Sequence, residues 1–269
     1  MKLLNGLELA GFIKERQAHA VRALRQAHKV SPKLVIIQTL DDPVINTYVR
    51  LKKAYGADIL VDVDHYMIEQ DEVKVMIEKL NQDDSVHGII LQLPLRDRNQ
   101  TTELCNLVAP AKDVDALGEA ATMDPATPMA IMWLLAGYNI ELAGKKILVI
   151  GNGQLVGRPL SKRLKNSGYD VTVADRSTED LAGLSLESDI VVTATGRPAI
   201  IYPAMLKHGA VVVDAGVASE EGKIVGDVDS SVYERDDLTI TPQKGGVGPL
   251  TICSLFENVI TSATPRGKS

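Results

Sequence analysis

Short apolar runs alternate with amphipathic stretches along the first part of the chain. Residues 1–25 repeat apolar side chains at helical spacing, which predicts an N-terminal helix. Its apolar positions are Leu7, Leu9, Phe12, Ile13, Val21 and Leu24. The runs at 33–38, 59–63 and 86–92 predict buried strands, and the stretches 44–55 and 70–82 predict helices. Strands that alternate with helices indicate parallel β-α-β units.

The segment 109–127 interrupts this alternation, because it is rich in Pro, Gly, Asp and Ala and poor in large apolar residues. A second series follows it. Helices are predicted at 128–138, from about 157, and at 250–263, and strands at 145–150, 170–174, 190–194, 210–214 and 238–241. We therefore predict an α/β protein of two domains that meet near the interruption.

Composition narrows the classes of function. The chain has 269 residues, of which 45% are hydrophobic and 24% charged, enough to bury a sizeable core. The net charge of −6 argues against a nucleic-acid or membrane-surface partner. Cys105 and Cys253 have no CxxC or Cys/His spacing, so we expect neither a disulfide framework nor a metal site. No signal-peptide core or run of about 20 apolar residues occurs, and a reducing, cytoplasmic location is expected.

A glycine-rich turn follows the strand predicted at 145–150 and precedes a predicted helix. Its residues are Gly151, Asn152, Gly153, Val156, Gly157, Arg158 and Pro159. Such a turn lets a pyrophosphate approach free N–H groups at a helix start. The spacing is GxGxxxG rather than GxGxxG, so an ordinary strand-to-helix connection is the alternative interpretation.

Asp175 and Arg176 end the next strand, where a dinucleotide fold contacts the adenosine ribose. The acid favours the free 2′-hydroxyl of NAD, whereas the arginine favours the 2′-phosphate of NADP. Thr195 and Gly196 follow another strand, where backbone can lie close to a ligand. An ordinary turn is the alternative there.

The N-terminal half also has polar residues that could bind a ligand, on a predicted helix, at the end of a predicted strand and in the irregular segment. Tyr48 and Lys52 lie one helical turn apart, which is also the pattern of an ordinary solvated face. Gln92 closes an apolar strand before Leu93, at the edge where open α/β sheets bind ligands. Asp113 and Asp115 lie in the irregular segment, where paired acids are commonly turn formers or metal ligands. No further calcium ligands lie nearby in the sequence, and a carboxylate that binds substrate is the more specific alternative. The glycine-rich segment 241–251 precedes the last helix and is either a ligand-binding or a plain loop.

Taken in order, these segments resemble the bifunctional methylenetetrahydrofolate dehydrogenase/cyclohydrolase family from about Leu7 to Ala263. The matching residues are Asp42-Pro43, Tyr48-Val49, Lys52, 86–95, Lys112-Asp-Val-Asp115, Thr127-Pro128, Val156-Gly-Arg-Pro159, Gly226-Asp-Val228 and 245–251. The resemblance implies a folate-binding domain (1–138 plus 250–269) and a Rossmann-like dinucleotide-binding domain (139–249) around a cleft. It also implies a homodimer.

The resemblance implies oxidation of 5,10-methylenetetrahydrofolate with NADP or NAD, and hydrolysis of the methenyl product to 10-formyltetrahydrofolate. The family's essential lysine maps onto Lys52, its stacking tyrosine onto Tyr48, its lysine-orienting glutamine onto Gln92 and its pterin-binding aspartate onto Asp115. The expected substrate site also includes Leu93, Gly248, Pro249 and Thr251. NADP is the expected preference, with Arg176 as the partner of its 2′-phosphate.

The chain departs from the family pattern at several positions. Ile45 replaces a usual Ser, Asn152-Gly153 a usual Arg-Ser, Ala116 a usual Gly, Ala126 a usual Cys, and Gln243-Lys244 a usual Val-Pro. Two other functions therefore stay open: a dehydrogenase that resembles shikimate dehydrogenase, and a non-catalytic folate or nucleotide sensor. Turnover of methylenetetrahydrofolate discriminates between them.

Overall fold

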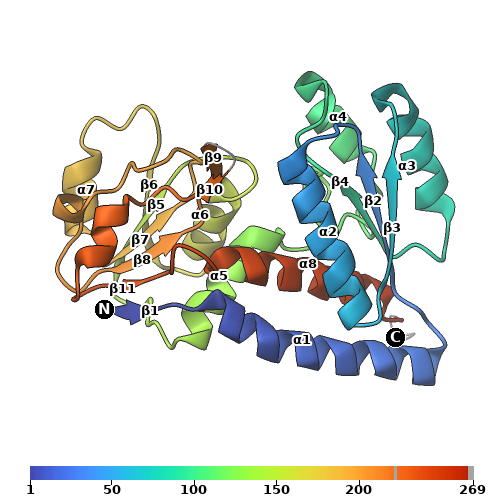
Figure 1. Ribbon diagram of the computed structural model, residues 1–269, viewed down its shortest axis with the longest axis horizontal. Coiled ribbons are helices and arrows are strands. Elements are labelled where there is room, and N and C mark those ends of the chain that lie inside the picture. Colours follow the sequence, from blue (N-terminus) through green and yellow to red (C-terminus); the bar gives the residue numbers. More distant parts are fainter. Residues whose placement is uncertain (221–222, 266–269) are drawn as a thin grey trace. The chain divides into compact units, whose positions relative to one another are not determined.

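Two parallel β-sheets organise the chain, and each belongs to its own compact unit (Figure 1). The computed structural model describes residues 1–220 and 223–265. The three-stranded unit comprises Gly11–Ala126 and Ile252–Ser269, and the six-stranded unit comprises Met1–Ala10 and Thr127–Thr251. The predicted α/β fold with a parallel sheet in each half is confirmed.

The three-stranded unit is built on the order β3-β2-β4, with all strands parallel. The strands are β2 (Lys33–Gln38), β3 (Asp62–Met67) and β4 (Gly88–Leu91). Its helical elements are α2 (Pro43–Asp58), η2 (Gln70–Glu72), α3 (Val73–Gln82), η3 (Arg98–Gln100) and α4 (Thr101–Asn106). Strand β2 is buried on both faces: Leu34 and Ile36 join one apolar cluster, and Val35 and Ile37 join the other. This two-sided burial explains why the strand reads as a continuous apolar run.

Helix α2 begins where the sequence supplies a cap. The Asp42 side chain accepts the backbone N–H groups of Val44 (2.8 Å) and Ile45 (3.1 Å). Pro43 occupies the first helical position, where no N–H partner is needed. Ile45 and Val49 are buried in the core and hold one face of the helix against the sheet.

The strand predicted at 59–63 was placed wrongly, because β3 begins only at Asp62. Residues 59–61 form the exit from α2, and Leu60 takes the left-handed conformation there (φ +66°). Ile59 and Val61 are buried in the core of the unit. Their apolar character therefore reflects packing and not strand pairing.

Two long helices frame the ends of the chain. Helix α1 (Gly6–Ala23) continues into one π-helical segment, η1 (Leu24–His28), and α8 (Val247–Ala263) is the last element. Within the three-stranded unit, Val21 and Leu24 pack in the same cluster as Phe256 and Val259 of α8. No helix within residues 1–220 and 223–265 is both long and apolar enough to cross a membrane.

The six-stranded unit has the strand order β1-β11-β8-β7-β5-β6, again all parallel. The strands are β1 (Lys2–Leu3), β5 (Lys146–Ile150), β6 (Asp170–Ala174), β7 (Ile190–Thr193), β8 (Val211–Asp214) and β11 (Thr239–Ile240). Its helical elements are α5 (Ala126–Gly137), α6 (Gly157–Asn166), α7 (Leu181–Glu187), η4 (Pro203–Met205) and η5 (Ser230–Glu234). A short antiparallel hairpin, β9 (Ala218–Glu220) with β10 (Lys223–Val225), was not predicted.

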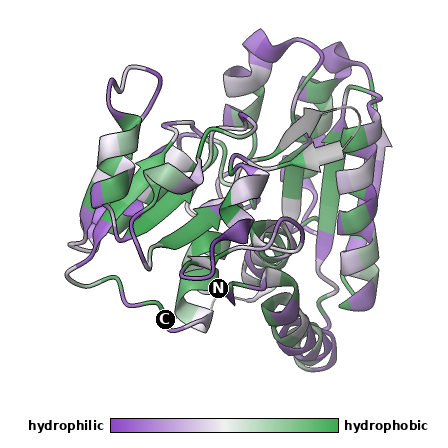
Figure 2. Cartoon of the chain, turned by 60° about the vertical axis from the view of Figure 1, so that its left-hand side comes forward, coloured by the Kyte–Doolittle hydropathy of each residue, from purple (hydrophilic) through white to green (hydrophobic). Residues whose placement is uncertain are grey.

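The connections of the six-stranded sheet reverse direction at β5. The chain passes from β5 to β6 on one side and returns to β7 on the other. Such a reversal marks the switch point at which open α/β sheets bind ligands beyond the carboxyl ends of their strands. Figure 2 shows the central strands of this sheet as hydrophobic, in agreement with burial between helices.

The division into units differs from the domain boundaries expected from sequence. Residues 1–10 and 127–138 belong to the six-stranded unit, because β1 pairs with β11 and the Tyr138 hydroxyl accepts the Asn5 N–H at 2.9 Å. A two-residue strand is too short to be recognised from its sequence pattern. The predicted domain boundaries stay a prediction, and residues 266–269 lie outside the described residues.

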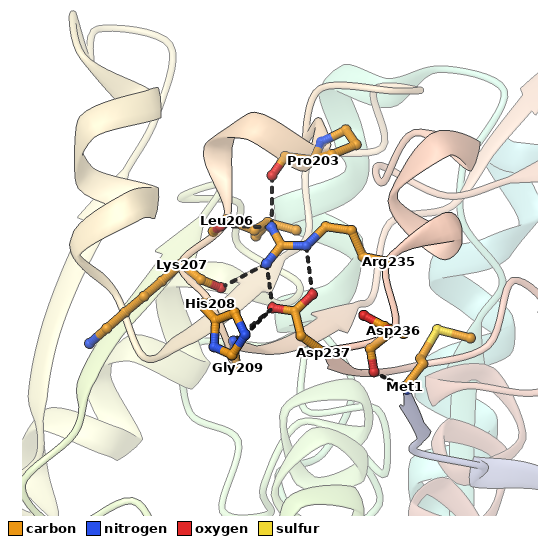
Figure 3. Close-up of polar contacts among 9 residues, drawn as sticks. All are labelled: Met1, Pro203, Leu206, Lys207, His208, Gly209, Arg235, Asp236 and Asp237. Atoms are coloured by element: carbon orange, nitrogen blue, oxygen red, sulfur yellow. Dashed lines mark hydrogen bonds and ion pairs between the residues drawn. The ribbon is translucent and has the colours of Figure 1, made fainter.

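Arg235 joins its own segment to residues 203–207 of the six-stranded unit (Figure 3). Its Nη1 donates to the carbonyl oxygens of Pro203 and Leu206, both at 2.8 Å, and its Nη2 donates to that of Lys207 at 3.3 Å. Its Nε and Nη2 also donate to the two oxygens of Asp237. These hydrogen bonds hold the Asp237 pKa below its usual range, so the pair is ionised near neutral pH.

We expect Arg235→Lys to lower the free energy of unfolding by about 1–3 kcal/mol. A lysine ammonium cannot reach the three carbonyls and the carboxylate together, so acceptors are left unsatisfied. Urea denaturation measures the change, and Arg50→Lys, at an exposed position of α2, is the matched control. Equal stability of the two variants would contradict the structural role of Arg235.

Candidate active site

Lys52, Gln92 and Asp115 come together in the three-stranded unit from three different segments. Lys52 lies on α2, Gln92 directly follows β4, and Asp115 lies in the irregular segment after α4. The Lys52 Nζ donates a hydrogen bond to Gln92 Oε1 at 2.8 Å. Gln92 is only 8% exposed, and its Nε2 donates to the Leu93 carbonyl at 3.2 Å. That second bond turns the amide oxygen toward the lysine.

The surroundings of this group shift two pKa values. Burial lowers the pKa of Lys52, and the nearby charge of Asp115 opposes that shift. Burial raises the pKa of Asp115, and Lys52 opposes that shift in turn. Desolvation disfavours the charged form of each group. The lysine is therefore more easily deprotonated than a solvated one and can exchange protons with a ligand.

Tyr48 lies on α2 one turn before Lys52, as their spacing predicts. The tyrosine ring is half-buried, and burial raises the pKa of its hydroxyl. Lys52 is not fully exposed either, so the pair is not an ordinary solvated helix face. Leu93, also half-buried, follows Gln92 and precedes Pro94.

The two aspartates of the irregular segment have different environments. Asp113 is 3% exposed and accepts the N–H groups of Gly118 (2.8 Å) and Leu117 (3.3 Å), so it shapes the loop. Asp115 accepts no hydrogen bond from residues 1–220 or 223–265. Ala116, which directly follows Asp115, takes the left-handed conformation (φ +55°) that favours glycine. The loop therefore leaves the Asp115 carboxylate available to a ligand.

Asn258 of α8 supports this loop and was missed by the sequence analysis. Its Nδ2 donates to the carbonyl oxygens of Val114 (2.8 Å) and Asp124 (2.9 Å). The side chain is 6% exposed and directly follows Glu257 in α8. Because this helix carries several other polar residues, the sequence pattern offers no signal that distinguishes Asn258.

The predicted dinucleotide turn lies at the carboxyl end of β5, at the switch point of the sheet. Gly151 has a φ of +106°, and its N–H donates to Ala174 at 2.8 Å. A Cβ atom at Gly157 would lie 1.7 Å from the Gly151 carbonyl oxygen. Only glycine lets α6 start this close to the turn.

The other turn residues leave the helix start accessible. Asn152, Gly153 and Arg158 are exposed, and the N-cap residue Val156 supplies no side-chain hydrogen bond to the first N–H groups of α6. Pro159 needs no N–H partner in the first turn. The Arg158 N–H is held by the Gly153 carbonyl oxygen (3.0 Å), whereas no described residue accepts the Gly157 N–H. A glycine cradle with this N–H at the helix start fits the pyrophosphate of a dinucleotide.

Asp175 directly follows β6, where the ribose of a bound dinucleotide is expected. Its Oδ1 accepts the Ser177 hydroxyl (2.6 Å) and the Ser177 N–H (2.9 Å). These two hydrogen bonds and one from the Asn152 side chain lower the Asp175 pKa. The carboxylate is thus oriented and ionised, whereas the neighbouring Arg176 is exposed.

Two further carboxylates shape the loop that carries Thr195 and Gly196, and the sequence analysis assigned them no role. Asp227 is completely buried and accepts the hydroxyls of Thr193 (2.5 Å) and Thr195 (2.9 Å) and the Thr195 N–H (2.7 Å). Asp214 accepts the Asp227 N–H at 3.1 Å. Asp227 belongs to the motif Gly226-Asp-Val228, but that motif does not reveal its partners. The pair positions the loop beside the dinucleotide turn.

The segment 241–251 differs from the expected loop. Helix α8 begins at Val247, so Gly248 and Pro249 lie in its first turn, and the Thr251 hydroxyl contacts the Val247 carbonyl at 3.3 Å. The expectation that the helix begins at 250 was wrong by three residues, because a proline is compatible with a first helical turn, where its missing N–H needs no partner. These three residues belong to the six-stranded unit, unlike Lys52 and Gln92.

The departures from the family pattern have structural explanations in part. Ile45 is 4% exposed and packs in the core of the three-stranded unit, where a serine hydroxyl would need a partner. Gln243 and Lys244 are exposed. Nothing in the structure explains their presence.

Two family profiles match the chain. The tetrahydrofolate dehydrogenase/cyclohydrolase catalytic domain matches residues 4–115, and the NAD(P)-binding domain of the same family matches residues 125–266. The bifunctional protein FolD of Campylobacter jejuni is 37% identical over 281 residues, which cover 99% of each chain. That of Nitratiruptor is 35% identical over 282 residues and covers all of both chains.

Solved structures agree. The crystal structure of the bifunctional enzyme FolD from Campylobacter jejuni has a TM-score of 0.91 at 36% identity, over 98% of each chain. The structure of a dehydrogenase-cyclohydrolase from Trypanosoma brucei, complexed with NADP cofactor and inhibitor, also has a TM-score of 0.91. It is 30% identical, and the match covers 97% of this chain and 96% of that one. A shikimate 5-dehydrogenase from Thermus thermophilus has a TM-score of 0.55 at 13% identity, so this likeness shows a shared fold alone.

The profile matches cover both halves of the chain, and the relatives match it from end to end. The resemblance inferred from the motifs is confirmed. The chain belongs to the tetrahydrofolate dehydrogenase/cyclohydrolase family.

Proposed function

We propose that this chain oxidises 5,10-methylenetetrahydrofolate with a nicotinamide dinucleotide and hydrolyses the methenyl product to 10-formyltetrahydrofolate. Family membership supports both reactions. The observation that carries the proposal is the hydrogen bond between Lys52 and Gln92 beside Asp115, within a chain that also has the glycine cradle. A direct test is turnover of purified protein with methylenetetrahydrofolate and each nicotinamide dinucleotide.

In the oxidation, the nicotinamide ring, when bound, accepts the hydride that leaves the methylene carbon. The chain contributes binding and orientation. Asp115 accepts hydrogen bonds from the pterin, and the half-buried Tyr48 ring stacks against the substrate. Holding the reacting carbon at a near-attack distance of about 3–3.5 Å supplies much of the rate.

In the hydrolysis, water attacks the cationic methenyl carbon while the neutral Lys52 amine takes up the proton that the water loses. The resulting ammonium then returns a proton to the ring nitrogen as the carbon–nitrogen bond breaks. The hydroxyl group that the water left on this carbon loses its proton to solvent as the formyl C=O forms. Gln92 keeps the amine directed by its hydrogen bond. Burial favours this cycle because it lowers the Lys52 pKa toward neutral pH.

The dinucleotide is held by the glycine cradle at β5 and by the residues after β6. NADP preference through Arg176 stays our prediction, and the oriented carboxylate of Asp175 opposes it. We propose that both dinucleotides are used, and that Asp175 limits the advantage of NADP by repelling its 2′-phosphate. A homodimer and a cytoplasmic location complete the proposal, and light scattering of the purified protein tests the dimer.

A non-catalytic sensor is the second candidate, motivated by Ile45, Asn152 and the Gln243-Lys244 replacement. The Lys52–Gln92 hydrogen bond argues against it, because a binding protein does not need an oriented, buried amine. Absence of turnover in a protein that binds both folate and dinucleotide would favour the sensor.

Gly157→Ala should weaken dinucleotide binding by about tenfold or more, equivalent to about 1.4 kcal/mol. The added Cβ would collide with the Gly151 carbonyl and displace α6 from the turn. Calorimetry measures the affinity. Gly11→Ala is the control, because Gly11 is exposed on α1, outside the turn, and a Cβ there meets nothing within 4 Å. Unchanged affinity in a folded Gly157→Ala protein would mean that the pyrophosphate binds elsewhere.

Substitutions at the end of β6 should change dinucleotide preference in opposite directions. Arg176→Ala removes the cation and should weaken NADP binding more than NAD binding. Asp175→Ser removes the carboxylate and should improve NADP binding relative to NAD. Affinities for both dinucleotides give the two ratios. If Arg176→Ala weakens both equally, Arg176 does not contact the 2′-phosphate.

Lys52→Met should abolish most methenyl hydrolysis, with a loss of about 10²–10⁴-fold typical of a missing general acid/base. Oxidation should fall less, because it needs no proton transfer from this residue. Methenyl decay above background and dinucleotide reduction give the two rates. Lys53→Met, at the exposed neighbouring position, is the control.

The pH profile adds a second readout. Because burial lowers the Lys52 pKa, the wild-type hydrolysis rate should show an ionisation below about 10.4, the ordinary value for lysine. That ionisation should disappear in Lys52→Met. Hydrolysis at the wild-type rate in this variant would rule out Lys52 as the proton carrier.

A further inference from the structure

The sequence contains two Asn-Gly dipeptides, Asn5-Gly6 and Asn152-Gly153. In such a pair, the backbone nitrogen of the glycine can attack the side-chain carbonyl carbon of the asparagine, because glycine has no Cβ to obstruct the approach. The attack needs a solvent-exposed asparagine and a glycine N–H that no acceptor holds. The structure of each pair therefore decides whether it reacts.

The Asn152-Gly153 pair meets both conditions. Both residues are exposed, and they lie between the end of β5 and the start of α6, outside any helix or strand. Space beside Gly153 is open, since a Cβ there would meet nothing within 4 Å. No acceptor among residues 1–220 and 223–265 takes the Gly153 N–H. The Asn152 side chain interacts with the exposed carboxylate of Asp175, whose pKa it helps to lower.

The Asn5-Gly6 pair is a natural control with the opposite environment. The Asn5 side-chain oxygen accepts the Glu8 N–H at 3.2 Å at the start of α1. Its backbone N–H donates to the Tyr138 hydroxyl at 2.9 Å. Gly6 is buried, and a Cβ there would lie 1.8 Å from the Gly246 carbonyl oxygen. There is no room for a ring at this position.

We propose that Asn152 is a deamidation site, and that its modification progressively inactivates the dinucleotide turn. The Gly153 nitrogen gives its proton to solvent and bonds to the Asn152 side-chain carbon. The bond from that carbon to the amide nitrogen breaks, ammonia leaves with a proton from water, and a succinimide ring remains. Water then opens the ring at either carbonyl, which yields aspartate or isoaspartate.

Both products disturb the site in which we place the pyrophosphate, so this consequence rests on the proposed function. The new carboxylate repels the pyrophosphate and lies beside Asp175, where two like charges oppose each other. Isoaspartate also lengthens the main chain by one carbon, in a turn where Gly151 and Gly157 are already in close contact. Dinucleotide affinity should fall as the modified fraction grows, and bound dinucleotide should slow the reaction.

The test is peptide mass mapping of the full-length protein during incubation in mildly alkaline buffer at physiological temperature. We expect a gain of about 1 Da at Asn152, with one added negative charge, and none at Asn5. Gly153→Ala should slow the change, because its methyl group crowds the attacking nitrogen while the open space beside residue 153 lets the variant fold. Circular dichroism checks that folding is kept.

An Asn152 that keeps its amide, an Asn5 that reacts as fast, or a Gly153→Ala protein that reacts at the wild-type rate would overturn the proposal. Parallel incubations with NAD and NADP separate it from the proposed function. Deamidation that neither dinucleotide slows would count against the placement of the pyrophosphate, while the modification site itself would stand. Slower deamidation with either dinucleotide would support both.

Discussion

The hydrogen bond from Lys52 to Gln92 is the interaction on which the three-stranded unit's chemistry depends. It exists because β2 and β4 are parallel neighbours, so that the helix leaving β2 and the residue ending β4 meet at one edge of the sheet. Burial of Ile45 and Val49 holds α2 in place. Burial of the Lys52 amine itself removes water from it and lowers its pKa.

In the six-stranded unit, the proposed dinucleotide site depends on a close approach between two backbone segments, the turn after β5 and the start of α6. Gly157 lets α6 start against Gly151, and the buried carboxylate of Asp227 holds Thr195 on the adjoining loop. One of these features is a backbone contact, and the other is a hydrogen bond to a completely buried side chain. The turn is accessible to solvent, which allows an anion to bind there. For the same reason Asn152 and Gly153 are exposed to water, which the deamidation reaction requires. An arginine-serine pair, usual in this family, lacks the glycine that makes such chemistry fast.

Two departures from the family pattern show how the fold accommodates change. Ile45 fills core space, where an apolar side chain is stabilised by burial. Ala116 keeps the left-handed conformation that the loop requires, because Asp113 and Asn258 hold the backbone on both sides. The loop geometry around Asp115 is therefore maintained by hydrogen bonds rather than by the conformational freedom of a glycine.

The sequence alone determined the alternation of strands and helices, the glycine turn after β5 and the helical spacing of Tyr48 and Lys52, because these are local patterns. It misplaced β3, since Ile59 and Val61 are apolar for packing and not for pairing. Only the tertiary structure decided that β1 joins β11, that Asp113 shapes the loop, and that the charges of Asp115 and Lys52 interact. Hydrogen bonds between residues distant in sequence, such as that of Asn258, leave no periodic signal. Burial, which shifts the pKa of Lys52, is likewise a property of the assembled fold.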